Sequence, residues 1–397
     1  MSKKAFLSGN EALAEGVRLA RPQVIAAYPI TPQTTVVEKL SDMVADAALE
    51  SEFLYVESEH SALSAAIGAS SVGARPFTAT SSQGLLYMVE CLYYASGGRF
   101  PIVMMNANRS TALPWNIYGD QRDSMSQLDS GWIQIYAENA QESLDAVLEA
   151  YAVAEHPDVL TPVMINLDGF VLTHTYELVE IPDSEQADAF LPPYKALYKM
   201  DLENPVNMAF SAGPGDNLEF KLKQHRAVLK AKSVVPQVTN RFQEVFGRNW
   251  GGLTQTYRAE DAEYLLITLG SLTGLARNVV DKLREQGVKA GLLKLRYIRP
   301  FPEEDILKAA AGVKSIGVIE KDVSFGMEGT LYTNVNSALY KGGITAPSFN
   351  FIGGLGGRDI TEANLFEVFD VLKEGAEAGK ASALERVRFI GLTLEED

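Results

Sequence analysis

Val24-Ile-Ala-Ala-Tyr-Pro-Ile-Thr-Pro32 joins a short apolar run to a turn that contains two prolines. The apolar run is typical of a buried strand, and Pro29 ends it because proline has no N–H to give to a β-ladder. From Thr34 to Ala48 the apolar residues recur at helical spacing. The sequence therefore predicts a strand, a rigid turn and a helix in direct succession.

The same step from strand to helix recurs over the first 180 residues. Apolar runs predict further strands at 53–56, 77–80, 101–105, 133–136 and 163–167. Helices are predicted at 61–68, 84–95 and 140–155, and a long polar loop at 106–130. Such alternation favours an α/β fold whose parallel sheet is covered by helices on both faces and binds ligands at the carboxyl ends of its strands.

The domain organisation follows from where this alternation stops and resumes. We interpret 1–180 as a first α/β domain, 181–258 as a proline-containing connecting segment, and 259–397 as a second α/β domain. One or two helices are expected between Arg226 and Phe246 of the connecting segment. In the second domain strands are predicted at 264–269, 289–295, 314–320 and 346–352, and helices at 275–286, 302–311 and 361–373.

Composition excludes several classes of function. The 397 residues carry a net charge of −16, which argues against a nucleic-acid partner because phosphate binding needs basic surface. Cys91 is the single cysteine, so this chain cannot hold an iron–sulfur cluster on cysteines of its own. No apolar run approaches the ~20 residues that span a bilayer, so we expect a cytoplasmic protein with no membrane partner.

Polar residues cluster where the first predicted strands end. Thr31 lies between two prolines, either in a rigid turn near a helix N-terminus or at a ligand. Glu57 and Glu59 follow the next strand and precede a helix of small residues. Either carboxylate complements the dipole of that helix, or one of them lies in a cleft and transfers a proton. The residues alone leave both alternatives open.

Two later strand ends carry further candidates. The hydroxyl-rich stretch Thr78–Gly84 either caps the following helix or binds a polar ligand group. Arg109 follows an apolar strand, where a guanidinium can hold a carboxylate through two parallel hydrogen bonds or pair with a nearby acid. No histidine spacing suits zinc, so no metal site is predicted in this chain, and the run Gly353–Arg358 lacks the spacing of a dinucleotide fingerprint.

Taken in order, these motifs resemble the α subunit of a 2-oxoacid:ferredoxin oxidoreductase, most closely the pyruvate:ferredoxin type (pyruvate synthase). The resemblance covers nearly the whole chain. Its first domain is similar to the pyrimidine-binding domain of thiamine-diphosphate enzymes, and its second to the C-terminal domain of transketolase. It rests on 28–32, 57–61, 77–84, 108–109, 131–134, 166–170 and 173–175, and on 295–301 and 319–321 in the second domain.

The resemblance implies roles for individual residues. Glu59, rather than Glu57, is implied as the glutamate that hydrogen-bonds the aminopyrimidine of thiamine diphosphate and starts catalysis. Thr31 and Arg109 match catalytic, substrate-contacting positions, with Arg109 pairing with the substrate carboxylate, and Ile117 matches an apolar position of the substrate pocket. The turn Tyr28, Pro29, Ile30 and Thr31 is implied as cofactor-binding.

The resemblance also implies partners, because the Gly-Asp-Gly…Asn motif that binds Mg²⁺ and diphosphate is missing from this sequence. A β subunit is expected to carry Mg²⁺ and share the cofactor. γ and δ (ferredoxin-like) subunits are expected to carry 4Fe–4S clusters and to pass electrons to ferredoxin, while coenzyme A takes the acyl group.

Substrate choice depends on fewer residues. A threonine at position 31 favours a monocarboxylic 2-oxoacid, with pyruvate as first choice. The loop Ala112–Trp115 departs from the expected pyruvate pattern, so 2-oxoisovalerate and phenylglyoxylate stay open. Two other functions also remain: a non-catalytic scaffold that binds coenzyme A or a nucleotide, and a transketolase-like transferase that needs no ferredoxin.

Overall fold

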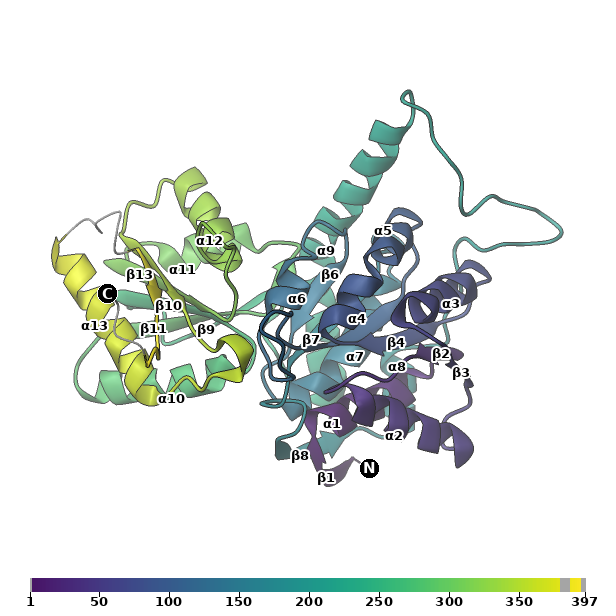
Figure 1. Ribbon diagram of the computed structural model, residues 1–397, viewed down its shortest axis with the longest axis horizontal. Helices are drawn as coiled ribbons and strands as arrows, with labels where there is room; N and C mark the ends of the chain where they lie inside the picture. Colours follow the sequence, from purple (N-terminus) through teal and green to yellow (C-terminus); the bar gives the residue numbers. More distant parts are fainter. Residues whose placement is uncertain (1, 379–385, 394–397) are drawn as a thin grey trace.

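The computed structural model describes residues 2–378 and 386–393, which form two α/β lobes side by side (Figure 1). The sheet of the first lobe has the strand order β12-β6-β7-β5-β4-β2-β3, and its neighbours are parallel except for the antiparallel pair β12–β6. The strands are β2 (Val24–Ala27), β3 (Glu52–Tyr55), β4 (Pro76–Thr80), β5 (Val103–Asn108), β6 (Ile133–Tyr136), β7 (Val163–Asp168) and β12 (Tyr297–Arg299).

Helices cover both faces of this sheet, because its central strands are buried on both sides and need two apolar covers. One core packs α1 (Gly9–Ala20), α2 (Thr34–Ala45) and α7 (Ala140–Ala154) against the sheet. The core of the opposite face contains α3 (Glu59–Ser71), α4 (Ser82–Tyr87) and α5 (Val89–Gly97). The carboxyl ends of the parallel strands stay free of these helices and are available for a site.

The second lobe has its own sheet, ordered β15-β14-β13-β10-β11-β9, which is parallel except for β9 against β11. One face packs on α10 (Leu272–Glu285) and α13 (Glu362–Ala378), the other on α11 (Glu303–Ala310) and α12 (Thr330–Lys341). The strands are β9 (Thr254–Tyr257), β10 (Tyr264–Leu269), β11 (Ala290–Leu295), β13 (Ser315–Glu320), β14 (Ser348–Ile352) and β15 (Val387–Phe389).

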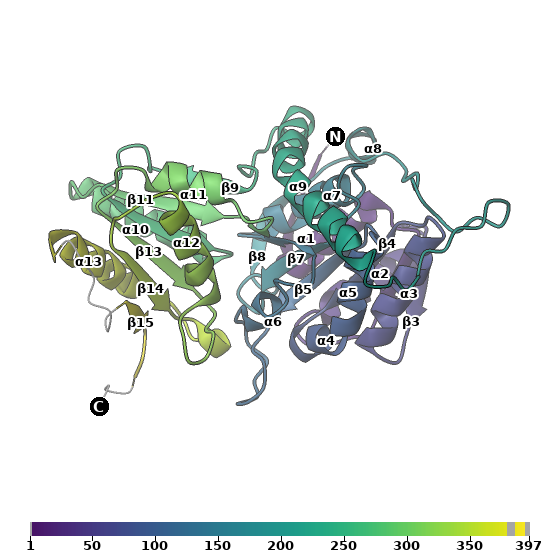
Figure 2. The same cartoon turned by 90° about the horizontal axis from the view of Figure 1, so that it is seen from above.

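The segment between the two sheets wraps the first lobe. β8 (Tyr176–Ile181) pairs with β1 (Lys3–Ser8), and α8 (Ser184–Phe190) follows. The long helix α9 (Asn217–Phe246) lies across the first lobe in Figure 2. Its second half is anchored by buried side chains, whereas its first half projects from the body (Figure 1).

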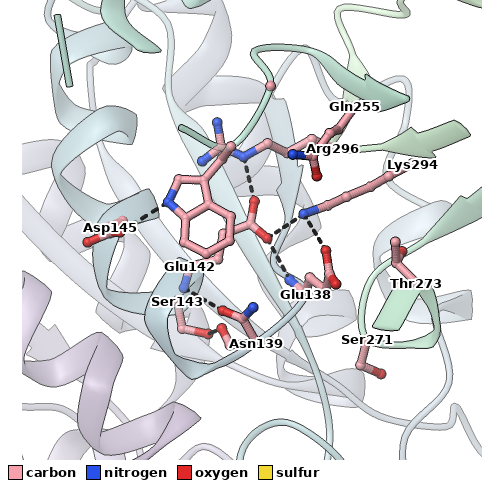
Figure 3. A network of polar contacts seen from close by, with 12 residues as sticks. Glu138, Asn139, Glu142, Ser143, Asp145, Gln255, Ser271, Thr273, Lys294 and Arg296 are labelled. Carbon is pink, nitrogen blue, oxygen red and sulfur yellow. Dashed lines mark hydrogen bonds and ion pairs between the residues drawn. The ribbon is translucent and has the colours of Figure 1, made fainter. Parts of the chain in front are cut away.

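Buried charges fasten the second lobe to α7 (Figure 3). Lys294, at the end of β11, lies 2.6 Å from Glu142 and 3.0 Å from Glu138. Arg296 pairs with Glu142 at 2.6 Å and also with Glu149. Burial alone raises the pKa of Glu142, but the two cations outweigh it and lower that pKa. Removing one partner would leave a buried charge with fewer counterions, so separating the lobes here is costly.

The predicted fold class is confirmed, since two successive α/β units with mainly parallel sheets are present. Several details differ. The helix predicted at 84–95 is two helices divided at Met88. Strand β5 continues into the predicted loop as far as Asn108, and α6 (Arg122–Met125) lies within that loop. In the described part of the chain no helix is long and apolar enough to cross a membrane.

Candidate active site

Four neighbouring strands of the first sheet bring the predicted site residues to one edge. The order β5-β4-β2-β3 places Arg109, the Ser81–Gly84 turn, the Tyr28–Thr31 turn and Glu57–Glu59 at successive carboxyl ends. Parallel strands end at the same edge, so stretches far apart in sequence meet there. Hydrogen bonds join the first three of these stretches, and Glu59 of the fourth packs against Gly84.

The turn after β2 is held by Gln33 rather than by a helix cap. The buried Gln33 side chain accepts a hydrogen bond from Ile30 N and donates one to Ala79 O, at 3.3 and 2.9 Å. Although Gln33 precedes α2, its side chain makes no capping bond. Tyr28, Pro29 and Thr31 are exposed and Ile30 is half-buried, so the turn presents its outer surface at the edge of the sheet.

The two glutamates after β3 differ in their surroundings. Glu57 is exposed and accepts a hydrogen bond from Ser61 Oγ. Ser58 caps α3 by accepting a bond from Ser61 N at 3.2 Å, which makes Glu59 the first helical residue. Glu59 is only 8% exposed, and its carboxylate has no hydrogen bond or ion pair among the described residues. Both carboxylate oxygens are therefore free to accept a hydrogen bond from a ligand.

Gly84 makes room for that carboxylate. A Cβ at position 84 would lie 2.6 Å from Glu59 Oε1 and 2.6 Å from Thr80 Oγ1, so only glycine fits there. The hydroxyls of Thr78, Thr80 and Ser81 are buried without an intramolecular hydrogen bond. An unpaired carboxylate beside unpaired hydroxyls fits a polar heterocycle such as an aminopyrimidine, and we therefore find the residues compatible with thiamine diphosphate.

Arg109 is placed by backbone carbonyls rather than by acids. Its Nη1 donates to Thr31 O at 3.0 Å and its Nε to Asn116 O at 3.2 Å, while the guanidinium stacks 5.4 Å from the Trp115 ring centre. No carboxylate forms an ion pair with its side chain within the described ranges, so the ion-pair alternative is wrong. Burial lowers the pKa of Arg109, with Asp123 acting against this, but an arginine keeps its charge.

The carboxylate of Asp123 connects these strand ends. Its Oδ2 accepts hydrogen bonds from the backbone N–H groups of Ser82 and Arg109, both at 3.1 Å. Its Oδ1 accepts from Asn108 Nδ2 at 2.8 Å and from Ser124 N at 2.7 Å. Burial raises the pKa of Asp123 to about 6, partly opposed by these donors. One buried side chain therefore fixes both the start of α4 and the backbone of Arg109.

The second lobe braces the loop that follows Arg109. Asn116 Nδ2 donates to Gly356 O, and Gly356 N donates to Asp120 Oδ2, both at 3.1 Å. Gly357 packs so closely that a Cβ there would lie 2.4 Å from Tyr118 Cβ. The glycine run therefore supports this loop, which carries the half-buried Ile117 and the exposed Leu113 and Trp115.

The comparisons with known proteins agree with this geometry. Residues 15–240 match the family described as pyruvate flavodoxin/ferredoxin oxidoreductase, thiamine diphosphate-binding. The chain belongs to this family. Residues 262–365 match the core domain II of pyruvate:ferredoxin oxidoreductase. The resemblance carried by the sequence motifs is thus confirmed.

Named relatives in the family cover the chain almost completely. Ketoisovalerate oxidoreductase subunit VorA of Pyrococcus horikoshii is 46% identical over 378 residues, 95% of each chain. Pyruvate synthase subunit PorA of Pyrococcus abyssi is 44% identical over 396 residues, 100% of each. A solved 2-oxoglutarate:ferredoxin oxidoreductase from Magnetococcus marinus, with 2-oxoglutarate, coenzyme A and succinyl-CoA bound, has a TM-score of 0.71. It is 20% identical over 94% of this chain and 65% of that one, which shows a shared fold.

Sequence reasoning missed the residues that hold the site together. Asp123 and Asn116 lie in a loop without periodicity, and Gln33 reads as an ordinary residue at a helix start. The one available signal was the pair Asn106 and Asn108 in an apolar strand, because buried amides require partners. In the described residues no group of three or more His, Cys, Asp or Glu side chains is arranged to hold a metal ion.

Proposed function

We propose that this chain is the α subunit of a thiamine-diphosphate-dependent 2-oxoacid:ferredoxin oxidoreductase. With coenzyme A the complex would convert a 2-oxoacid to acyl-CoA, CO₂ and reduced ferredoxin. The observation that carries the proposal is the pair of groups without counterions at one sheet edge, the Glu59 carboxylate and the Arg109 guanidinium. Family membership supplies the cofactor class that such a pair would serve.

Glu59 is proposed to bind the aminopyrimidine. Its carboxylate is buried beside Gly84, and it has a free oxygen to share a proton with a ring nitrogen. The unpaired hydroxyls of Thr80 and Ser81 lie at the end of β4, near the same Gly84, and would hold further polar atoms of the ring. The turn Tyr28–Thr31 would form the adjoining wall. When bound, thiamine diphosphate supplies the electron sink that a 2-oxoacid needs to lose its carboxylate.

Arg109 is proposed to bind the substrate carboxylate. Its Nε and one Nη1 hydrogen are used by Asn116 O and Thr31 O. A guanidinium has five N–H donors, so the second Nη1 hydrogen and the two on Nη2 stay available. Those at the Nη1–Nη2 end form a fork that matches a carboxylate. The residues that fix Arg109 therefore leave its recognition end open.

A small monocarboxylic 2-oxoacid fits these residues best, with pyruvate as first choice. Thr31 is short and neutral, and beside Arg109 the site offers no second cation for a dicarboxylate among the described contacts. A branched substrate such as 2-oxoisovalerate is the second candidate. The exposed Trp115 favours it, because its ring offers apolar surface next to Arg109. The relatives include enzymes named for each substrate.

Partner subunits are proposed to supply what this chain lacks. A β subunit would hold Mg²⁺ and the diphosphate, since the Gly-Asp-Gly…Asn motif is absent from this sequence. γ and δ subunits would carry the 4Fe–4S clusters, because one cysteine cannot ligate them. The curated relatives are themselves named as subunits. A cytoplasmic location stays a prediction.

The test compares Glu59→Gln with Glu57→Gln in the purified complex. Both changes remove one carboxylate charge, but only Glu59 is buried at the site. Because proton transfer by a positioned carboxylate contributes about 10²–10⁴-fold, Glu59→Gln should lower 2-oxoacid-dependent viologen reduction by that factor. Glu57→Gln should keep most activity. Unchanged turnover of Glu59→Gln would favour the scaffold alternative, and a complex that transfers ketol groups without reducing viologen would favour a transketolase-like enzyme.

A further inference from the structure

An apolar arm extends from the first lobe. Between α8 and α9 the chain makes a wide excursion beyond the body (Figure 1). We call residues 195–216 the arm. It lacks helix and strand and yet carries large apolar side chains in solvent. These exposed residues are Leu197, Tyr198, Met200, Leu202, Val206 and Phe210, and the projecting half of α9 adds Leu218, Phe220 and Leu222.

Only a few contacts hold the arm to this chain. Met200 N donates to Ser71 O at 2.7 Å at the end of α3, and Ser71 Oγ contacts the Met200 sulfur at 3.6 Å. The rings of Phe210 and Phe220 pack 4.9 Å apart, which ties the arm to α9. Leu202 in the arm is fully exposed. Apolar surface of this extent on a projecting segment is typical of an interaction site.

The arm and the body enclose a large hollow. Its volume is about 1210 Å³, and its walls come from α3, α5, the arm and the start of α9. Tyr93, Tyr94 and Phe220 give it an apolar lining. His60 and Ser64 also line it, so one of its walls is formed by the helix that begins at Glu59.

Helix α3 runs from the candidate cofactor site at Glu59 to the arm contact at Ser71, and one side of it is exposed. The exposed residues Ser64 and Gly68 of α3 and Val72, which caps its end, follow at four-residue spacing on one side. A Cβ at Gly68 would meet open space. The helix spans about 18 Å from Glu59 to Ser71 at 1.5 Å per residue. A partner with a standard interface of about 800 Å², roughly 30 Å across, covers both ends at once.

We propose that the arm and this hollow grip the same subunit that holds Mg²⁺ and the diphosphate of the cofactor. The proposal rests on the proposed function, which requires such a subunit over Glu59. A second copy of this chain does not suit the position, because it would cover Glu59 without bringing the missing diphosphate motif. The arm therefore enlarges the interface that shares the cofactor. Its contacts, which we call the clasp, bind that subunit whether or not the cofactor is present.

Cross-linking of the purified complex tests which subunit lies there. Lys199 in the arm and Lys221 in α9 are exposed and serve as natural attachment points for a lysine-reactive cross-linker. We expect both to link to the subunit whose sequence contains Gly-Asp-Gly…Asn. Links to another copy of this chain or to a cluster-bearing subunit would overturn the proposal, as would no link from either lysine while other exposed lysines react.

Variants measure what the arm contributes to assembly. Leu202→Asp and Phe210→Asp should each weaken binding of that subunit by about 10-fold, the loss expected for a central apolar contact. Tyr340→Asp is the control, because Tyr340 is an exposed aromatic residue on α12 of the other lobe. Tm values equal to that of the unchanged chain would show that the arm variants fold. Equal binding by arm variants and control would refute the clasp.

The two proposals fail in different ways. If the arm links to the diphosphate subunit but no 2-oxoacid supports viologen reduction, the clasp stands and the proposed activity is wrong. If Glu59→Gln abolishes activity while Leu202→Asp assembles normally, the activity stands and the clasp is wrong. Binding of the subunit is also measured with and without added thiamine diphosphate. Binding that does not need the cofactor comes from contacts of the arm, whereas binding that needs it is made through the cofactor.

Discussion

Replacing Arg109 by methionine tests the substrate-binding part of the site. Methionine keeps a long apolar stem against Trp115 but removes the positive charge and the donor fork. Arg109→Lys is the companion variant, because lysine keeps the charge and loses only the planar geometry. Both changes leave Glu59, on another strand end, unaltered.

The expected magnitude follows from the donors that are free. Two charge-assisted hydrogen bonds to a substrate carboxylate contribute about 1.5–3 kcal/mol each. Arg109→Met loses both, so kcat/KM for the 2-oxoacid should fall by about 10²–10⁴, at 1.36 kcal/mol for each factor of ten. Arg109→Lys keeps one such bond and should lose about 10–10².

The assay is viologen reduction by the intact complex, with the concentrations of 2-oxoacid and coenzyme A varied separately. Loss of carboxylate binding should raise KM for the 2-oxoacid and leave KM for coenzyme A within about twofold. Copurification of the partner subunits shows that the complex is intact. A fall of less than tenfold in Arg109→Met, or an equal rise in both KM values, would refute the assignment of Arg109.

Two further predictions concern buried charge. Lys294→Met removes the cation that Glu138 and Glu142 share, although Glu138 keeps Arg277 and Glu142 keeps Arg296. The free energy of unfolding, measured by urea denaturation, should fall by about 1–3 kcal/mol, and an unchanged value would contradict the role given to the ion pairs. Burial raises the pKa of Asp123 from 3.8 to about 6, so its stabilising neutral form is lost as pH rises through that range. The unfolding free energy of the unchanged chain minus that of Asp123→Asn should therefore fall by about 1 kcal/mol from pH 5 to 7.5. If this difference in free energy does not change with pH, the pKa of Asp123 is not raised by folding.

The sequence predicted the strands well because each carries a strong local signal. Apolar runs that end at proline, glycine or polar residues located β2, β4, β7, β10 and β13 to within about two residues. Their carboxyl ends then indicated where a site would form. Glu59 and Arg109 could be located in this way, although the choice of Glu59 over Glu57 needed the family resemblance.

Elements that depend on tertiary contacts escaped prediction. Helix α1 contains Gly16, which reads as a helix breaker but lies against Leu144 O, where a Cβ would come within 2.5 Å. Helix α12 is rich in poor helix formers, and its N-terminus is held by Glu320, which accepts hydrogen bonds from Leu331 N and Tyr332 N at 2.7 and 3.1 Å. Leu144 is far from Gly16 in sequence, and Glu320 belongs to the preceding strand rather than to α12, so no local helix pattern shows either partner.

Strand β12 has a consequence for the order in which this chain folds during synthesis. It closes the edge of the first sheet by pairing with β6, yet it lies more than 150 residues later in the chain. At 5–20 residues per second the ribosome needs roughly 10–30 s to make that stretch. During this time β6 is an open edge able to pair with other nascent chains. A fragment that ends before Tyr297 keeps that edge permanently, so the first sheet is complete only after most of the second lobe has been made.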